Sequence, residues 1–164
     1  MSERARTWLT LFPLTLAGLV VAGALALNFT GPRDDLRSAR IAEAAQLIAR
    51  AREAVSQEDW AQVREYAGRA VGLNPSHVVA RLLLGLGHLN MNDLRNAEAE
   101  FRQVLVLAKE DRNSEAWAHN NLGVVFLRRG QFRKAAQEYE AALDLDPFNE
   151  QARANLMGVR RYLR

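Results

Sequence analysis

Apolar residues recur along most of the chain with the spacing of an α-helix. From residue 41 onward they fall at i, i+3, i+4 and i+7, as in Ile41, Ala44, Ala45, Ile48, Ala51 and Val55. The sequence after residue 32 shows no alternation of apolar and polar residues of the kind that a half-buried strand requires. The pattern therefore predicts an all-α protein in which each helix buries one face.

The N-terminal part of the chain has a different pattern. No charged residue occurs between Arg6 and Arg33, and residues 8–27 are almost all apolar. Because an α-helix rises about 1.5 Å per residue, a segment of this length spans the roughly 30 Å of hydrocarbon in a bilayer. We expect a tail at residues 1–7 and a transmembrane helix at residues 8–30, through which the protein contacts the lipid bilayer.

The same segment has features of a cleaved signal peptide. Arg4 and Arg6 precede the apolar stretch, and residues 24–26 read Ala-Leu-Ala, the kind of sequence at which signal peptides are cut. The apolar core of a signal peptide usually has about 7–15 residues, and this stretch is longer. The length favours an uncleaved anchor, and a soluble periplasmic adaptor released by cleavage is the alternative.

The flanking charges do not give a clear orientation, because arginines lie on both sides of the apolar segment. The short tail favours export of the rest of the chain, and the preference for arginine over lysine suggests a bacterial source. We expect a single-pass protein of the bacterial inner membrane with a periplasmic soluble part, or a cytoplasmic one as the alternative. Gly18, Ala22 and Ala26 recur every four residues, a stripe that favours close packing of another transmembrane helix.

Residues 44–149 contain three units that align with one another. With Ala44, Val78 and Ala116 as first positions, Leu84-Gly85 matches Leu122-Gly123 at positions 7 and 8. Pro75 and Pro147 both fall at position 32. Apolar residues recur at positions 20, 24 and 27: Val63, Ala67, Ala70, Ala97, Phe101, Val104, Ala135, Tyr139 and Ala142. The alignment divides the region into units at residues 44–77, 78–115 and 116–149.

This set of positions resembles the tetratricopeptide repeat (TPR), a helix–turn–helix unit of about 34 residues. The third unit matches over its whole length, and the first is weaker, with Arg50-Ala51 in place of Leu-Gly. The resemblance implies a superhelix of three repeats, preceded by the transmembrane helix and followed by a capping helix at residues 150–164. Residues 31–43 are expected to form a linker and the start of the first helix, and Asn149 is expected to begin the capping helix.

Several residues fit the packing of such helix pairs. Gly85 and Gly123 lie inside predicted helices, where glycine is unfavourable unless two helices approach closely. Asn92 and Gly130 lie in the predicted turns and suit a left-handed backbone. The second unit is longer than the others and lacks the proline. We expect its second helix to be lengthened and followed by a charged loop, with Asn113 or Ser114 as the next N-cap.

Composition narrows the possible functions. The 164 residues include 22 Lys and Arg against 19 Asp and Glu, a net charge of +3 that does not indicate nucleic-acid binding. The chain has no cysteine, which excludes disulfides, thiol nucleophiles and thiolate metal sites. The sequence around His77, His88 and His119 does not offer enough acidic residues at helical spacing to complete a metal site. We therefore expect no metal, no cofactor, no catalytic residue and no enzymatic activity.

The resemblance also implies a concave groove lined by the first helix of each repeat. The groove positions carry Arg52, Val79, Leu82, Leu86, Asn90, Trp117, Asn120, Asn121, Val124 and Arg128. The carboxylate clamp of chaperone-binding relatives needs Lys and Asn where this chain has Ile48 and Arg52, so that clamp is not expected. An apolar groove suits an apolar helix or peptide, with Trp117 as the leading contact. Alternatively, the groove leucines pack against neighbouring repeats.

These features together predict a membrane-anchored scaffold or assembly factor that holds a protein partner at the membrane and binds no nucleic acid. A permanent structural subunit of a larger membrane complex is the alternative function.

Overall fold

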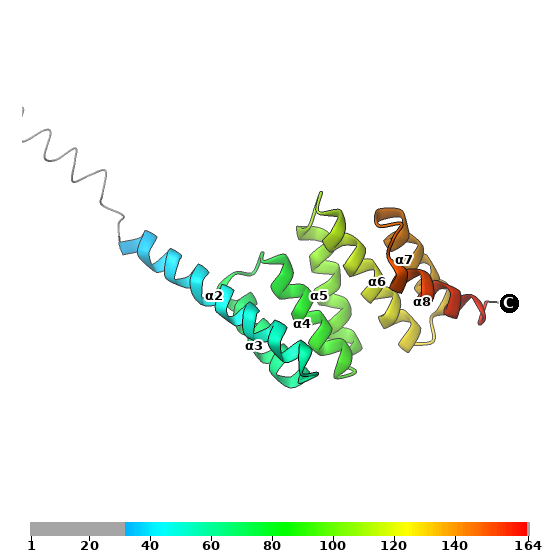
Figure 1. Ribbon diagram of the computed structural model, residues 1–164, viewed down its shortest axis with the longest axis horizontal. Coiled ribbons are helices and arrows are strands. Elements are labelled where there is room, and N and C mark those ends of the chain that lie inside the picture. The colour runs from blue at the N-terminus through cyan, green and yellow to red at the C-terminus, as the bar shows by residue number, and fades with distance from the viewer. Residues whose placement is uncertain (1–31, 164) are drawn as a thin grey trace, which may run out of the picture. The chain divides into compact units, whose positions relative to one another are not determined.

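The computed structural model describes residues 32–163, which form seven helices and no strand (Figure 1). In chain order the helices are α2 (Pro32–Ser56), α3 (Trp60–Leu73), α4 (Val78–Asn90), α5 (Leu94–Leu107), α6 (Arg112–Arg128), α7 (Phe132–Leu145) and α8 (Glu150–Arg160). The prediction of an all-helical fold is confirmed for this part of the chain. The predicted tail, the transmembrane helix and its packing residues Gly18, Ala22 and Ala26 lie outside the described residues. Of the helices between residues 32 and 163, none combines the length and the apolar character needed to cross a bilayer.

The chain divides into two units, Met1–Ala39 and Arg40–Arg164. Of the first unit, the structure describes residues 32–39, the beginning of α2. The helix pairs and the last helix belong to the second unit, and every contact discussed below lies within it.

The core of the second unit is built from the predicted packing positions. The nine residues at positions 20, 24 and 27 of the three units all have no exposed surface: Val63, Ala67, Ala70, Ala97, Phe101, Val104, Ala135, Tyr139 and Ala142. They lie on α3, α5 and α7, the second helix of each pair. Because side chains three and four residues apart share one face of a helix, this spacing gives each second helix a continuous buried stripe.

The glycines inside helices mark close approaches, as expected. A β-carbon on Gly85 would lie 2.6 Å from Cε1 of Phe101, and one on Gly123 would overlap the ring of Tyr139. The large aromatic side chain of each second helix therefore fits against bare backbone on the first. The predicted left-handed turns are also confirmed, with φ values of 63° at Asn92 and 71° at Gly130.

Asp or Asn residues form the N-caps of most of the described helices. Asp59 and Asp93 each accept a hydrogen bond from the backbone N–H three residues further on, at 3.0 and 3.3 Å, which satisfies a donor that has no partner within the helix. Asn149 caps α8 in the same way, 2.9 Å from the N–H of Ala152, as predicted. Ala152, Leu156 and Val159 form the buried face of α8.

The extra residues of the second unit lengthen α6, and the expectation of a longer second helix is wrong. Helix α5 has 14 residues, the same length as α3 and α7, whereas α6 has 17 against 13 in α4. The chain leaves α5 at Ala108, which is buried in the core, and Glu110 then takes a left-handed conformation with φ of 77°. This turn ends the helix before the charged residues can extend it.

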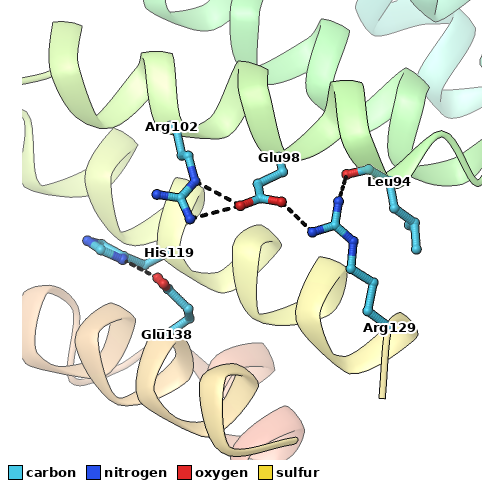
Figure 2. A network of polar contacts seen from close by, with 6 residues as sticks. All are labelled: Leu94, Glu98, Arg102, His119, Arg129 and Glu138. Atoms are coloured by element: carbon cyan, nitrogen blue, oxygen red, sulfur yellow. Dashed lines mark hydrogen bonds and ion pairs between the residues drawn. The ribbon is translucent and has the colours of Figure 1, made fainter. Parts of the chain in front are cut away.

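A carboxylate holds the end of α6 against α5 (Figure 2). Glu98 accepts a hydrogen bond from Nε of Arg102 at 2.9 Å and forms an ion pair with Arg129. Arg129 follows the last residue of α6 and also donates to the backbone carbonyl of Leu94 at 2.9 Å. Partial burial of Glu98 raises its pKa, but the hydrogen bonds from Arg129 and Arg102 outweigh burial and leave the pKa of Glu98 lowered.

Candidate partner-binding groove

An open groove with a volume of about 450 Å³ lies between three helices of the second unit. Its walls are contributed by α2, α4 and α6, which are the first helices of the three pairs. The lining residues are Arg52, Val55, Val79, Leu82, Leu83, Leu86, Asn113, Ser114 and Trp117. The groove is thus mainly apolar, and of the described side chains that line it only Arg52 is charged.

Helix α4 supplies the floor of the groove because it is apolar on two faces. One face carries Ala80 and Leu84, which are buried against α2 and α3. The other face carries Val79, Leu82 and Leu86 at i, i+3 and i+7, and these side chains are half-buried. A helix that is apolar all round is normally covered on every side. The groove leaves this apolar face of α4 partly open, because Val79 and Leu82 also pack against the core clusters and Leu86 does not.

The extra turn of α6 forms one wall of the groove. Asp111 is the N-cap of α6, which corrects the expectation that Asn113 or Ser114 fills this role. Its carboxylate reaches both the hydroxyl and the backbone N–H of Ser114, at 2.6 and 3.3 Å. These two hydrogen bonds lower the pKa of Asp111, with the hydroxyl contributing most. The cap fixes the first turn, so Asn113, Ser114 and Trp117 face the groove.

Half of the predicted groove residues line this groove. They are Arg52, Val79, Leu82, Leu86 and Trp117, and Trp117 keeps 54% of its surface exposed. Val55, Leu83, Asn113 and Ser114 line it too and are not among the ten residues of the predicted set. The two polar residues belong to the lengthened segment between repeats, so no position of the repeat pattern marks them.

Asn120 and Asn121 lie away from the groove and are buried, with 5% and 7% of their surface exposed. Asn121 donates from Nδ2 to the carbonyl of Trp117 at 2.8 Å. Asn120 accepts a hydrogen bond from Nδ2 of Asn155 at 3.1 Å, which joins α6 to α8. Both amides are thus used inside the fold.

The three other predicted residues also make internal contacts. Asn90 donates from Nδ2 to the carbonyl of Leu86 at 3.0 Å. Arg128 donates from Nη1 to the carbonyl of Leu89, near the end of α4. Val124 is half-buried and packs against the main core cluster. None of the three is among the residues that line the groove.

The histidines pair with local groups. His77 caps α4 by accepting from the N–H of Ala80 at 3.4 Å, and Nδ1 of His88 lies 3.1 Å from Asp93. Nδ1 of His119 on α6 lies 2.8 Å from Glu138 on α7 (Figure 2). Within residues 32–163, no three His, Cys, Asp or Glu side chains come together in a way that would hold a metal ion.

Comparison with known proteins agrees with this architecture. Residues 77–147, which span the second and third helix pairs, match the model of the tetratricopeptide repeat family. No curated protein matches the sequence.

Solved TPR domains share the fold. The TPR domain of Arabidopsis OM64 is 17% identical, with a TM-score of 0.68 over 74% of this chain and 98% of that one. The second TPR domain of human RPAP3 is 19% identical, with a TM-score of 0.66 over 74% of this chain and 98% of that one. An O-GlcNAc transferase from Thermobaculum terrenum is 26% identical, with a TM-score of 0.67 over 73% of this chain and 22% of the transferase. The chain therefore has the TPR fold, and its second and third helix pairs carry the sequence pattern of the family.

Proposed function

We propose that this protein is a scaffold or assembly factor that binds a partner protein in the groove between α2, α4 and α6. The observation that carries the proposal is the open apolar face of α4, beside a tryptophan that keeps 54% of its surface exposed. Aromatic side chains in such a position contribute much of the binding energy of protein interfaces. The RPAP3 domains whose folds resemble this one were solved with HSP70 and HSP90 peptides bound, which supports a peptide-binding role.

The proposal extends to where binding takes place. The apolar segment of residues 8–30 would anchor the protein in a membrane. The arginine-rich composition of the chain favours the bacterial inner membrane, and the short tail before the segment favours repeats on the periplasmic side, with the cytoplasmic side as the alternative. Anchoring would hold the groove near the membrane and raise the local concentration of membrane partners. The role is binding rather than catalysis.

The groove is tested by comparing partner capture by the full-length protein and its variants in mild detergent. Leu86→Ala combined with Trp117→Ala should abolish capture of the partners that the wild type retains, while the helical circular dichroism stays unchanged. Phe148→Ala is the matched control, because Phe148 is an exposed aromatic residue outside the groove, with 86% of its surface accessible. Capture that survives the double substitution would contradict the proposal.

The same capture experiment separates an assembly factor from a permanent subunit. An assembly factor releases its partner, so partners should be recovered at less than stoichiometric amounts. A constant stoichiometric set of membrane proteins would instead identify a structural subunit.

A further inference from the structure

We propose that the groove selects a partner segment whose apolar side chains are accompanied by a side-chain carboxylate, which pairs with Arg52. This inference rests on the proposed binding function and adds the chemistry of the partner.

The first argument is the unpaired charge of Arg52. Within residues 32–163 the structure gives its guanidinium no ion pair and no hydrogen bond, although seven ion pairs occur elsewhere in that part of the chain. The positions three and four residues away along α2 are Ile48, Ala49, Val55 and Ser56, so no acidic residue stands at the spacing that gives helical ion pairs. An arginine presents five N–H donors and is charged at every physiological pH. These donors are available to a ligand.

The second argument is where this charge lies. Arg52 shares the groove with Val55 on its own helix and with Leu82 and Leu86 on α4. A segment that buries apolar side chains on α4 would therefore bring its neighbouring residues close to the guanidinium. In surroundings with few competing polar groups, a carboxylate is favoured there over a neutral or positively charged group.

The third argument limits the source of the carboxylate. Residues 8–27, the apolar stretch of this chain, contain no acidic residue. Of the described side chains that line the groove, Asn113, Ser114 and Trp117 also carry hydrogen-bonding groups, but all three are uncharged and the Ser114 hydroxyl already donates to Asp111. The groove thus offers one cationic contact, which suits a single acidic side chain on another protein.

The test begins with full-length protein in mild detergent and a phage-displayed library of random short peptides. Peptides recovered by the wild type are resynthesised with amidated C-termini, so that any carboxylate is on a side chain. Their affinities are measured by fluorescence anisotropy for the wild type, Arg52→Glu, Leu86→Ala and Arg95→Glu. Arg95 is the matched control because it is exposed on α5 and does not line the groove.

We expect the recovered peptides to carry Asp or Glu next to apolar residues. Replacing that acid by its amide should weaken binding to the wild type and to Arg95→Glu by roughly five-fold, the range of a partly exposed ion pair. The same replacement should have no effect on Arg52→Glu, which should instead prefer a Lys in that position. Circular dichroism confirms that each variant is folded.

Two other results would overturn the inference and leave the proposed function intact. One is a set of peptides that need Leu86 but bind equally well with acid or amide. The other is self-association that Leu86→Ala abolishes, which would make the occupant a second copy of the chain. If the proposed function is wrong, the result is different: the Leu86→Ala substitution will not weaken the binding of any peptide.

Discussion

The ring of Tyr139 on α7 occupies the space that a β-carbon would fill on Gly123 of α6. Phe101 has the same relationship to Gly85 one repeat earlier. The first and second helices of these repeats are therefore spaced by an aromatic ring that rests on helix backbone. Two glycines that weaken their own helices allow two of the largest buried side chains to be enclosed.

Gly123→Ala should destabilise the protein although alanine is the better helix former. The added methyl group would force the ring of Tyr139 away, and overpacking of this kind costs about 1–3 kcal/mol. Gly72→Ala is the control, because a β-carbon there meets nothing within 4 Å. It should leave stability unchanged or raise it by up to about 1 kcal/mol. Urea denaturation followed by circular dichroism measures both, and changes of the same sign would contradict the packing described.

Tyr139→Phe should stabilise the protein. The hydroxyl of Tyr139 is buried and has no hydrogen-bond partner among the described residues, and removing an unsatisfied polar group is worth about 1 kcal/mol or more. Phenylalanine keeps the ring on Gly123. A loss of stability in this variant would mean that the hydroxyl has a partner, such as a bound water molecule.

Tyr139 should also make the stability of the wild type depend on pH, and the Tyr139→Phe variant tests this. Burial raises the pKa of Tyr139 from 10.0 to about 12. A raised pKa means that folding favours the neutral hydroxyl over the ionised one, so the free energy of unfolding does not depend on this group below pH 10 and falls as the pH rises from about 10 to about 12. Denaturation midpoints measured across this range should fall more steeply for the wild type than for Tyr139→Phe. Parallel curves would contradict the shift.

Glu98→Gln should weaken the contact between α5 and the end of α6. The substitution removes the charge that accepts from Arg102 and pairs with Arg129, and the expected loss is about 1 kcal/mol at neutral pH. Glu140→Gln is the control, since its pair with Arg160 is about half exposed and should contribute only a few tenths of a kcal/mol. Equal losses in the two variants would contradict this ranking.

Lowering the pH should remove the stabilisation that the Glu98 carboxylate contributes. The pKa of Glu98 is lowered in the folded state from its ordinary value of 4.5, so its carboxylate stabilises the fold above that value and the stabilisation disappears as the pH falls through the folded-state pKa. Stability measured between neutral pH and about 3 should therefore decline more for the wild type than for Glu98→Gln.

Asp111→Ala should loosen the wall of the groove. Loss of an N-cap side chain destabilises the first turn of a helix, and here that turn also carries Asn113 and Ser114. Peptide affinity should fall in this variant although Asp111 does not line the groove. Asp111→Asn keeps a side chain that caps well and should retain both stability and affinity. An unchanged affinity in Asp111→Ala would show that the extra turn is not needed for binding.

Much of the fold could be predicted because each packing position repeats. Phe101 and Tyr139 stand at the same position of two units, and small or apolar residues precede and follow them at helical spacing. The role of Asn149 as a helix N-cap could be predicted from the local sequence alone, because its side chain caps the helix that follows it directly.

The lengthened segment could not be placed from its sequence. Lys109, Glu110 and Asp111 are compatible with either helix or loop, and the left-handed backbone of Glu110 decides between them. Ala108, two residues before Glu110, is buried in the core by contacts with distant parts of the chain, which the local sequence does not reveal.

Contacts between helices account for the other differences. Glu138 stands four residues after Lys134, a spacing that allows an ion pair along one helix, but its carboxylate lies 2.8 Å from Nδ1 of His119 across the helix pair. Asn120 is buried because Asn155, 35 residues away in sequence, supplies a donor for its amide oxygen. The repeat positions predict which face of a helix packs against its neighbours. They do not predict the angle at which two helices pack.

The open face of α4 has one more consequence. Leu86 lines the groove and belongs to none of the core clusters, whereas Ala80 and Leu84 hold the same helix in the core. The polar wall of the groove lies in a segment that the repeat pattern does not constrain. Recognition can therefore evolve separately from folding, and new partners can be selected by substitutions at Arg52 and Asn113 while the scaffold is retained.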